Sequence, residues 1–231
     1  MMRSRAAALI AYLWLAVAHA AEPFPGSTSD HNGAAMCAVP IGTANAQVLV
    51  PATASSGHPW VLAASLYDLE NPALVNLART HHELVKQGFH VVAIEPGGIL
   101  GAPDPEKSWD AVYREMTTRF GLSREVVLMG VGREGVPALR WAAANPGKVS
   151  CLYLDKAVCH EPQTTASTLN PGHEQKDPTY TVNFGVKLQE RLRELNVPCD
   201  LLYPGAPDAT HTSVSDYLIA RLAVRQSSEP K

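Results

Sequence analysis

Short apolar segments alternate with amphipathic helical segments along most of the chain, and this alternation limits the choice of fold more than any other feature. Because the apolar segments are almost continuously hydrophobic, both faces of the sheet that they form must be covered. We therefore predict an α/β fold with a mostly parallel sheet and helices on both faces. The predicted strands cover 48–50, 60–67, 90–95, 126–130, 151–155 and 199–205, and the predicted helices cover 71–87, 108–120, 136–145, 182–195 and 213–224.

The first 20 residues, MMRSRAAALIAYLWLAVAHA, have the pattern of a secretory signal peptide. Two arginines precede an apolar run over 6–18, and the final AHA supplies the small residues that signal peptidase requires. The run is shorter than the roughly 20 apolar residues of a membrane span. We expect cleavage before Ala21, a secreted or periplasmic protein, and no membrane span after cleavage.

The charge of the remaining chain excludes some partners. Residues from Ala21 onward carry 17 of the 19 Lys and Arg residues and all 22 Asp and Glu residues. This balance gives no basis for binding nucleic acid. With 46% hydrophobic residues the chain can build one core. We predict an extended lead-in over 21–46, with one edge strand at most, and a single domain over 47–231.

All four cysteines lie in the part that we expect to be exported, where disulfides can form. Four cysteines allow three pairings, and the sequence does not choose among them. The alternative is buried thiols, which suits Cys151 and Cys199 because each lies in a predicted strand. The absence of a C-x-x-C motif argues against a zinc site of that kind. The cysteines are Cys37, Cys151, Cys159 and Cys199.

The segment VVLMGVGREGVPALRW at 126–141 allows two interpretations. As written, a strand leads through G-x-G-x-x-G into a helix, which is the pattern of a dinucleotide-binding turn. With serine in place of Gly132, the same pattern would be the nucleophile elbow of an α/β-hydrolase.

The dinucleotide interpretation is the weaker of the two. In its favour, Asp155 ends the next strand 20 residues after Gly135, about where an acid would bind a ribose hydroxyl. However, several strands precede the motif and only two follow it, which is too few for a cofactor-binding half. Glu134 would also repel a pyrophosphate. We therefore expect no cofactor.

The residues around the motif resemble the α/β-hydrolase family, and more closely a group of secreted bacterial α/β-hydrolase-like proteins. In that group a Gly-x-Ser-Arg-Gly-Gly elbow precedes a helix that ends in W-A-A-x-N-P, and a strand then leads into a Pro-Val-Cys-like segment. GVGREG, WAAANP and LDKAVC stand at the matching positions here. The resemblance covers 58–160 and is weaker beyond, where 182–195, 199–203 and the loop containing His211 look like the last elements of the family.

The resemblance implies a serine mechanism from which the nucleophile is missing. Gly132 stands at the position of the serine and has no atom that can attack a carbonyl. Glu134 adds bulk and charge where the family has a small residue. The backbone N–H of Arg133, and one from the loop at Tyr67 and Asp68, correspond to the donors that bind the oxyanion.

The resemblance also implies a base and an acid. His211 follows the predicted last strand, where the family has its catalytic base, although a surface loop histidine is equally compatible with the sequence. Asp155 is the candidate acid, and its alternative is a loop cap or a pair with Lys156. In many members of the family the acid follows a further strand between the helix that ends near 145 and the last strand. That strand is missing here and a polar loop at 160–181 takes its place, so we expect a fold shortened in its C-terminal half.

Other histidines do not form a convincing site. The polar loop holds a group of potential ligands, but their spacing matches no established motif such as H-E-x-x-H, so we predict no metal site. His81 and His82 are adjacent on a predicted helix and therefore point in different directions, which makes them surface residues by default. The loop residues are His160, Glu161, His173, Glu174 and Asp177.

Two functions remain. The first is a catalytically degenerate protein with a binding or scaffold role, whose partner is a small-molecule or ester-like ligand. The alternative is a hydrolase of an ester or related carbonyl substrate, in which Glu134 or His211 activates a water molecule.

Overall fold

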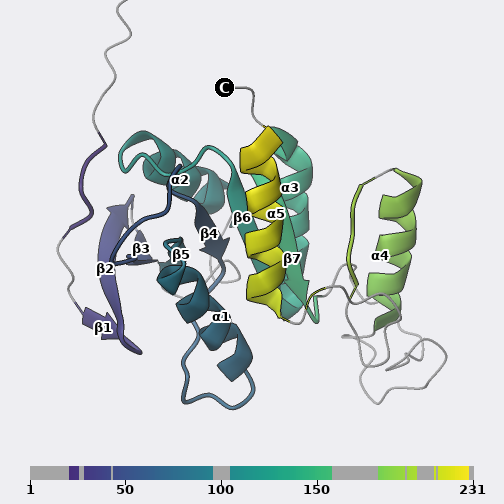
Figure 1. Ribbon diagram of the computed structural model, residues 1–231, viewed down its shortest axis with the longest axis horizontal. Helices are drawn as coiled ribbons and strands as arrows, with labels where there is room; N and C mark the ends of the chain where they lie inside the picture. Colours follow the sequence, from purple (N-terminus) through teal and green to yellow (C-terminus); the bar gives the residue numbers. More distant parts are fainter. Residues whose placement is uncertain are drawn as a thin grey trace, which may run out of the picture.

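A computed structural model describes residues 21–25, 29–42, 44–95, 105–157, 182–195, 197–201, 211 and 213–228. The expected signal peptide and the polar loop at 160–181 lie outside these residues. Figure 1 shows a central sheet with helices packed around it. The strands are β1 (Ser29–His31), β2 (Ala34–Ile41), β3 (Ala44–Leu49), β4 (Trp60–Ala63), β5 (His90–Glu95), β6 (Val126–Val131) and β7 (Val149–Asp155). The helices are α1 (Val75–Lys86), α2 (Pro105–Thr118), α3 (Gly135–Ala144), α4 (Val182–Glu194) and α5 (Val214–Ser228).

The seven strands form one sheet in the order β1-β2-β3-β5-β4-β6-β7. Strands β5, β4, β6 and β7 are parallel, whereas β1, β2 and β3 join the sheet as an antiparallel meander. The prediction of an α/β fold with a largely parallel sheet is confirmed. The carboxyl ends of the parallel strands lie at the same end of the sheet. The segments that follow β4, β6 and β7 therefore meet there.

The antiparallel part differs from the expected lead-in over 21–46. That range contains β1, β2 and the start of β3 rather than one edge strand at most. Strand β2 alternates buried and accessible residues, with Cys37 and Val39 fully buried. A strand with one solvent-exposed face contains many polar and small residues. It therefore lacks the continuous apolar run on which the sequence prediction depended.

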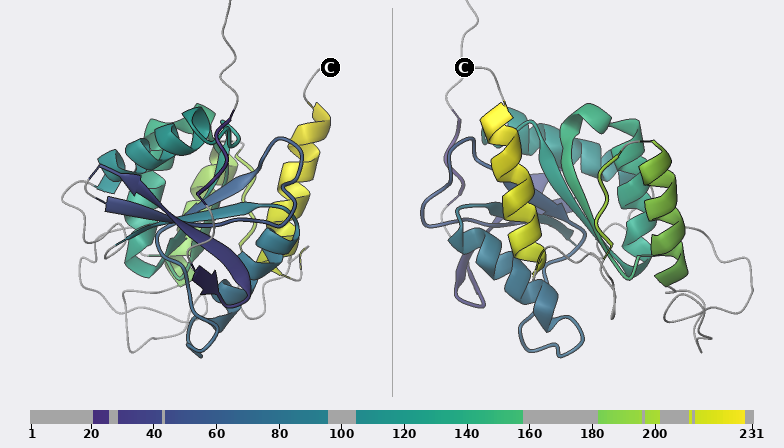
Figure 2. Two further views of the ribbon diagram at one scale, coloured as in Figure 1. Left: turned by 90° about the vertical axis from the view of Figure 1, so that its left-hand side faces the viewer. Right: turned by 45° about the vertical axis from the view of Figure 1, so that its right-hand side comes forward.

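Helices cover both faces of the sheet, as predicted (Figure 2). On one face α2 and α3 contribute Trp109, Met116 and Trp141 to the core. On the other face α1 contributes Leu84 and α5 contributes Leu218. Both cores meet at the central strands, which accounts for the complete burial of β4 and of most of β6.

The C-terminal part differs from the prediction in one respect. Residues 199–201, where we predicted the start of a strand, form no strand, and 202–205 lie outside the described residues. The sheet therefore ends at β7 in the part of the chain that the structure describes. Helix α4 lies beyond this edge (Figure 1) and contacts 199–201, since the Gln189 side-chain amide donates to the Cys199 carbonyl at 3.1 Å.

Of the described cysteines, Cys37 and Cys199 are free thiols, and Cys159 lies outside the described residues. Cys37 is fully buried, whereas Cys151 and Cys199, which the sequence favoured as buried thiols, are half-buried. Within the described ranges, no helix is both long enough and apolar enough to cross a membrane.

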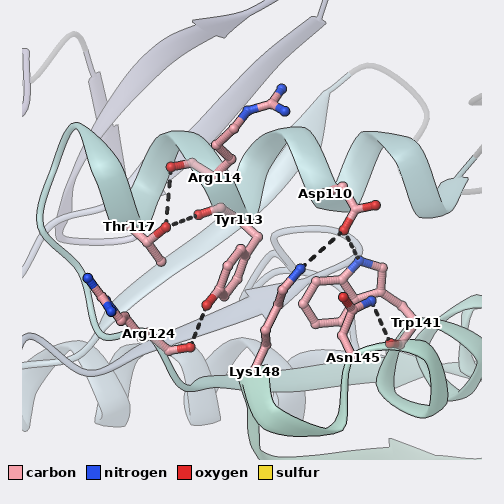
Figure 3. Close-up of polar contacts among 8 residues, drawn as sticks. All are labelled: Asp110, Tyr113, Arg114, Thr117, Arg124, Trp141, Asn145 and Lys148. Carbon is pink, nitrogen blue, oxygen red and sulfur yellow. Dashed lines mark hydrogen bonds and ion pairs between the residues drawn. The ribbon is translucent and has the colours of Figure 1, made fainter.

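Polar contacts fix α3 against α2 (Figure 3). The Trp141 indole donates to Asp110 Oδ1 at 3.0 Å, and the Lys148 ammonium lies 3.8 Å from the same oxygen. The side-chain amide of Asn145 donates to the Trp141 carbonyl at 3.0 Å, which satisfies an acceptor at the end of α3. The WAAANP segment thus anchors the helix that follows the glycine motif. Separately, the hydroxyl of Tyr113 in α2 donates to the Arg124 carbonyl, in the loop before β6, at 2.6 Å.

Candidate functional site

The glycine motif forms a strand, a tight turn and a helix next to the edge strand of the parallel part of the sheet. Strand β6 lies between β4 and β7 and leads through a 3₁₀ turn, Gly132–Glu134, directly into α3. Gly132 has a φ of 56°, a conformation that residues with a Cβ rarely adopt. The geometry is that of an elbow, and glycine relieves the backbone strain that a serine at this position would carry.

Gly130 allows the close approach of α3 to β6. A Cβ on Gly130 would lie 3.0 Å from the Gly135 Cα, 3.1 Å from the Ala138 Cβ and 3.2 Å from the Glu134 carbonyl oxygen. Two of these atoms belong to the backbone and cannot rotate away. Gly130 therefore has a packing function and Gly132 a backbone function, and no phosphate is needed to explain either.

Tyr67 and Glu134 meet above the ends of β4 and β6. The Tyr67 hydroxyl donates a hydrogen bond to Glu134 Oε2 at a donor–acceptor distance of 3.4 Å. Tyr67 is 8% exposed, and burial raises the pKa of its phenol, to which the negative charge of Glu134 adds. Burial also raises the pKa of the Glu134 carboxyl, while the hydrogen bond from Tyr67 acts in the opposite direction.

Asp155 extends this group along the same edge. It is the last residue of β7, and in the parallel register it lies opposite Val131, which immediately precedes the elbow. Burial raises the pKa of its half-buried carboxyl. The positive charge of the neighbouring Lys156 opposes this rise. The negative charge of Asp155 also raises the pKa of Tyr67. The fold thus brings together Tyr67, Glu134 and Asp155, which come from three different strand ends.

Arg133 and Asp68 lie at the outer side of the group. Arg133 is exposed in the turn after Gly132, and no side chain caps the start of α3. Backbone N–H groups at the start of a helix favour a carbonyl oxygen or an anion. Asp68 is exposed and stabilises its own turn, since its carbonyl accepts from the Asn71 N–H at 3.2 Å and its carboxylate accepts from the Glu70 N–H at 3.4 Å.

His211 lies against α5. Its ring meets the ring of Tyr217 edge-on, with 5.2 Å between the ring centroids and 83° between the planes. Tyr217 in turn packs with the core on the α1 face of the sheet. The catalytic role that the family resemblance implies for His211 stays a prediction.

The expectation that His81 and His82 are surface residues is wrong for His81. This side chain is 1% exposed, and its Nε2 lies 3.2 Å from the Met129 sulfur. Burial lowers the pKa of His81 to about 3, so the ring is neutral at physiological pH. It continues the apolar spacing of Leu77, Ala78, Leu84 and Val85, and this helical period was the signal that could have revealed it.

His81 and His31 support the tyrosine of the site, and sequence reasoning missed both. The His81 ring stacks on Tyr67 at 5.4 Å between ring centroids. From the antiparallel edge, His31 donates through Nε2 to the Tyr67 carbonyl at 3.1 Å. The His31 ring also stacks on His82 at 6.2 Å. No sequence pattern links these residues, because they meet only when β1 folds over α1.

The metal-ligand candidates of the polar loop lie outside the described residues. Among the residues that the structure describes, no group of three or more His, Cys, Asp or Glu side chains is arranged to hold a metal ion.

Comparisons with known proteins point to one fold. No protein-family model matches the chain, and no curated protein matches it. Solved structures do match. A candidate carboxylesterase from Lactobacillus plantarum WCFS1 superposes with a TM-score of 0.54 and 11% identity, covering 83% of this chain and 97% of its own. A lipase/esterase from Lactobacillus plantarum gives 0.53 and 11% identity, with 84% and 98% covered.

A third solved structure, a carboxylesterase from Lactobacillus plantarum WCFS1, gives a TM-score of 0.52 at 11% identity and covers 84% of this chain and 97% of its own. At this identity the likeness concerns the fold. It confirms the α/β-hydrolase-like fold that the resemblance in the sequence implied. The chain has the fold of the α/β-hydrolase family.

Proposed function

We propose that this chain is an exported α/β-hydrolase-fold protein that binds a small carbonyl or ester-like ligand at the elbow and does not hydrolyse it. The observation that carries the proposal is Gly132, which occupies the elbow with a φ of 56° and has no side chain that can attack. The turn has the geometry of a nucleophile elbow, but it has no side chain that could act as the nucleophile.

The neighbouring hydroxyl does not replace the missing serine. Tyr67 is the hydroxyl that the fold places beside the elbow turn through Glu134. Its raised pKa makes the phenolate scarce at neutral pH, and its proton is already directed at a carboxylate. A nucleophile requires the opposite, namely a lowered pKa or an adjacent base that is free to accept the proton.

The same edge retains groups that can bind a carbonyl. The 3₁₀ turn Gly132–Glu134, which leads into α3, has no side-chain cap at its start, and the exposed Arg133 adds a positive charge beside it. Backbone donors are unaffected by the loss of a side chain, so the loss of the serine leaves them in place. The buried Tyr67 ring stacks on His81, so the Tyr67 and Glu134 pair beside the turn is held in position.

The rival function is hydrolysis by a water molecule that Glu134 or His211 activates. Glu134 is half-buried and has a raised pKa, as a general base requires, but one of its oxygens accepts the bond from Tyr67. The rival predicts turnover of esters without labelling by serine-directed reagents, so a direct assay separates the two functions.

The first test is hydrolysis of p-nitrophenyl acetate and butyrate by the purified protein, with fluorophosphonate labelling in parallel. We expect no turnover above buffer and no labelling, together with saturable binding of the unhydrolysed butyrate ester. Gly132→Ser should acquire labelling, and adding His211→Ala should remove it. Gly147→Ser is the matched control, because a Cβ at Gly147 meets no atom within 4 Å and the turn lies at the other end of α3.

Turnover by the natural protein that disappears with Glu134→Gln or His211→Ala would replace the binding proposal with the water-activating mechanism. Absence of both turnover and ester binding would refute a ligand site at the elbow. Export is tested separately, by N-terminal sequencing of the protein secreted from a bacterial host, which we expect to begin at Ala21.

A further inference from the structure

Three histidines lie where β1 meets α1 and the tyrosine of the candidate site. His31 is the last residue of β1, and its ring is nearly parallel to the ring of His82 on α1, with 6.2 Å between the centroids and 9° between the planes. His81, the neighbour of His82 on α1, stacks on Tyr67. Histidine side chains thus connect β1 to the helix and to the site.

Strand β1 is a short edge strand. It comprises three residues, of which two are exposed, and its neighbour in the sheet that the structure describes is the start of β2. The turn at Asn32 and Gly33, with φ values of 54° and 89°, joins the two strands and preserves the shape of the hairpin. A short edge of this kind opens locally at a low cost in free energy. The contacts of His31 therefore decide whether β1 stays in place.

The contact between the two rings favours an uncharged His82. Its Nε2 is buried and has no hydrogen-bond partner among the described residues. A protonated imidazole carries a hydrogen on both nitrogens, so its Nε2–H would be buried without an acceptor. Burial lowers the pKa of His82, and the positive charges of His31 and Lys86 lower it further, whereas the negative charge of Asp30 opposes them.

We propose that the stacked rings of His31 and His82 form an acid-sensitive latch, which holds β1 against α1 and Tyr67 while His82 is neutral and releases β1 when His82 is protonated. The bond from His31 Nε2 to the Tyr67 carbonyl, at 3.1 Å, survives protonation of His31, because a protonated ring still donates. The latch therefore opens when His82 takes up one proton from the solvent. That proton adds a charge beside His31 and leaves a buried N–H without an acceptor.

The groups around the latch set the direction of the pH dependence. On β1, the Asp30 carboxylate accepts from the Gly33 N–H at 2.7 Å and is thus engaged in the turn. On α1, Lys86 adds a positive charge, and His81 stays neutral because burial lowers its pKa to about 3. In the released hairpin, His82 should titrate near the ordinary histidine value of about 6.5. Because the latched form binds the proton less readily, the latch is closed above this pH and opens as pH falls below it.

Opening of the latch reaches the candidate site through Tyr67. The Tyr67 carbonyl loses the donor on His31, and the hydroxyl of the same tyrosine bonds Glu134. We expect the affinity of the elbow for p-nitrophenyl butyrate to be lower at pH 5.5 than at pH 7.0 for this reason. This consequence rests on the proposed function, whereas the latch itself does not.

The test is amide hydrogen exchange followed by mass spectrometry at pH 7.0 and 5.5, with protection corrected for the intrinsic pH dependence of exchange. We expect protection over 29–36 to fall at least about threefold at the lower pH, because uptake of one proton shifts an equilibrium by up to about tenfold per pH unit. His82→Phe keeps a ring against His31 but binds no proton, so protection should be equal at the two pH values. His82→Arg carries a permanent charge, so protection should already be low at pH 7.0 and should not fall further.

The matched control is His58→Asn, which removes an exposed histidine before β4, at the opposite end of the sheet, and suits the φ of 48° at this position. This variant should keep the full pH response of residues 29–36. Equal protection of the natural protein at both pH values, the same loss in His82→Phe, or full protection of His82→Arg at pH 7.0 would each overturn the latch. The exchange result decides the latch even if the elbow binds no ester, so failure of the proposed function and failure of the latch are distinguishable.

Discussion

The packing of α3 on β6 leads to a quantitative prediction for Gly130→Ala. The new Cβ would lie 3.0 Å from the Gly135 Cα and 3.2 Å from the Glu134 carbonyl oxygen, so the start of α3 must move by a few tenths of an ångström. Overpacking of this kind costs about 1–3 kcal/mol. Replacing glycine by alanine inside a strand returns roughly 0.5–1 kcal/mol through a less flexible unfolded chain. We expect a net loss of about 1–2 kcal/mol.

Urea unfolding followed by tryptophan fluorescence measures this loss, because Trp60, Trp109 and Trp141 are all buried in the core that α3 helps to close. In thermal unfolding the same loss corresponds to a decrease in Tm of roughly 2–8 °C for a domain of this size. The control is Gly147→Ala, where the Cβ meets no atom within 4 Å, and we expect a change within about 0.5 kcal/mol.

The reasoning would be refuted if Gly130→Ala and Gly147→Ala had the same free energy of unfolding. That result would mean that α3 adjusts to the extra methyl group at no cost, and that the elbow is less tightly held than the contacts indicate. A loss much larger than 3 kcal/mol would instead show that the elbow and helix cannot form at all with a side chain at this position.

Three further experiments test the site and the packing of α3. Tyr67→Phe removes the hydrogen bond that stabilises the charged form of Glu134, so the pKa of that carboxyl should rise further, as measured by carbon-13 NMR titration. The native state keeps His81 neutral down to about pH 3, whereas the unfolded chain binds a proton below about 6.5. Stability should therefore fall as pH decreases between these values, by up to ~1.4 kcal/mol per pH unit, and His81→Leu should flatten this dependence. Trp141→Phe removes the bond to Asp110 and part of the ring volume, so urea unfolding should show a loss of about 1–3 kcal/mol, whereas Asp110→Asn, which keeps an acceptor, should cost less than 1 kcal/mol.

The elements that sequence reasoning located best are those with strong local patterns. Strand 90–95 is found with the predicted bounds, and helix 136–145 is displaced by one residue. Both have uniform apolar or helical periodicity and are bounded by glycine or polar residues, so the pattern is local. The strands of the antiparallel edge were missed because only one of their faces is apolar, and their pairing joins residues that lack a local signal.

The candidate site also has residues that the sequence could locate and contacts that it could not. Gly132, Glu134 and Asp155 could be located from the sequence because a motif or a strand end marks each of them. The bond from Tyr67 to Glu134 joins residues 67 positions apart, and the support of Tyr67 by His31 joins residues 36 positions apart. Such contacts depend on the order of the strands in the sheet, which no periodicity reveals.

By itself, the sequence determined that this chain has an α/β fold with a strand, a glycine turn and a helix, and it predicted that Gly132 stands at the nucleophile position of the turn. These conclusions follow from hydrophobic period and from the chemistry of single residues. Only the tertiary structure decided that His81 is buried beneath Tyr67 and that Tyr67 meets Glu134 at the ends of β4 and β6. Burial is a property of the packed chain, because the atoms that exclude water from a side chain come from segments distant in the sequence.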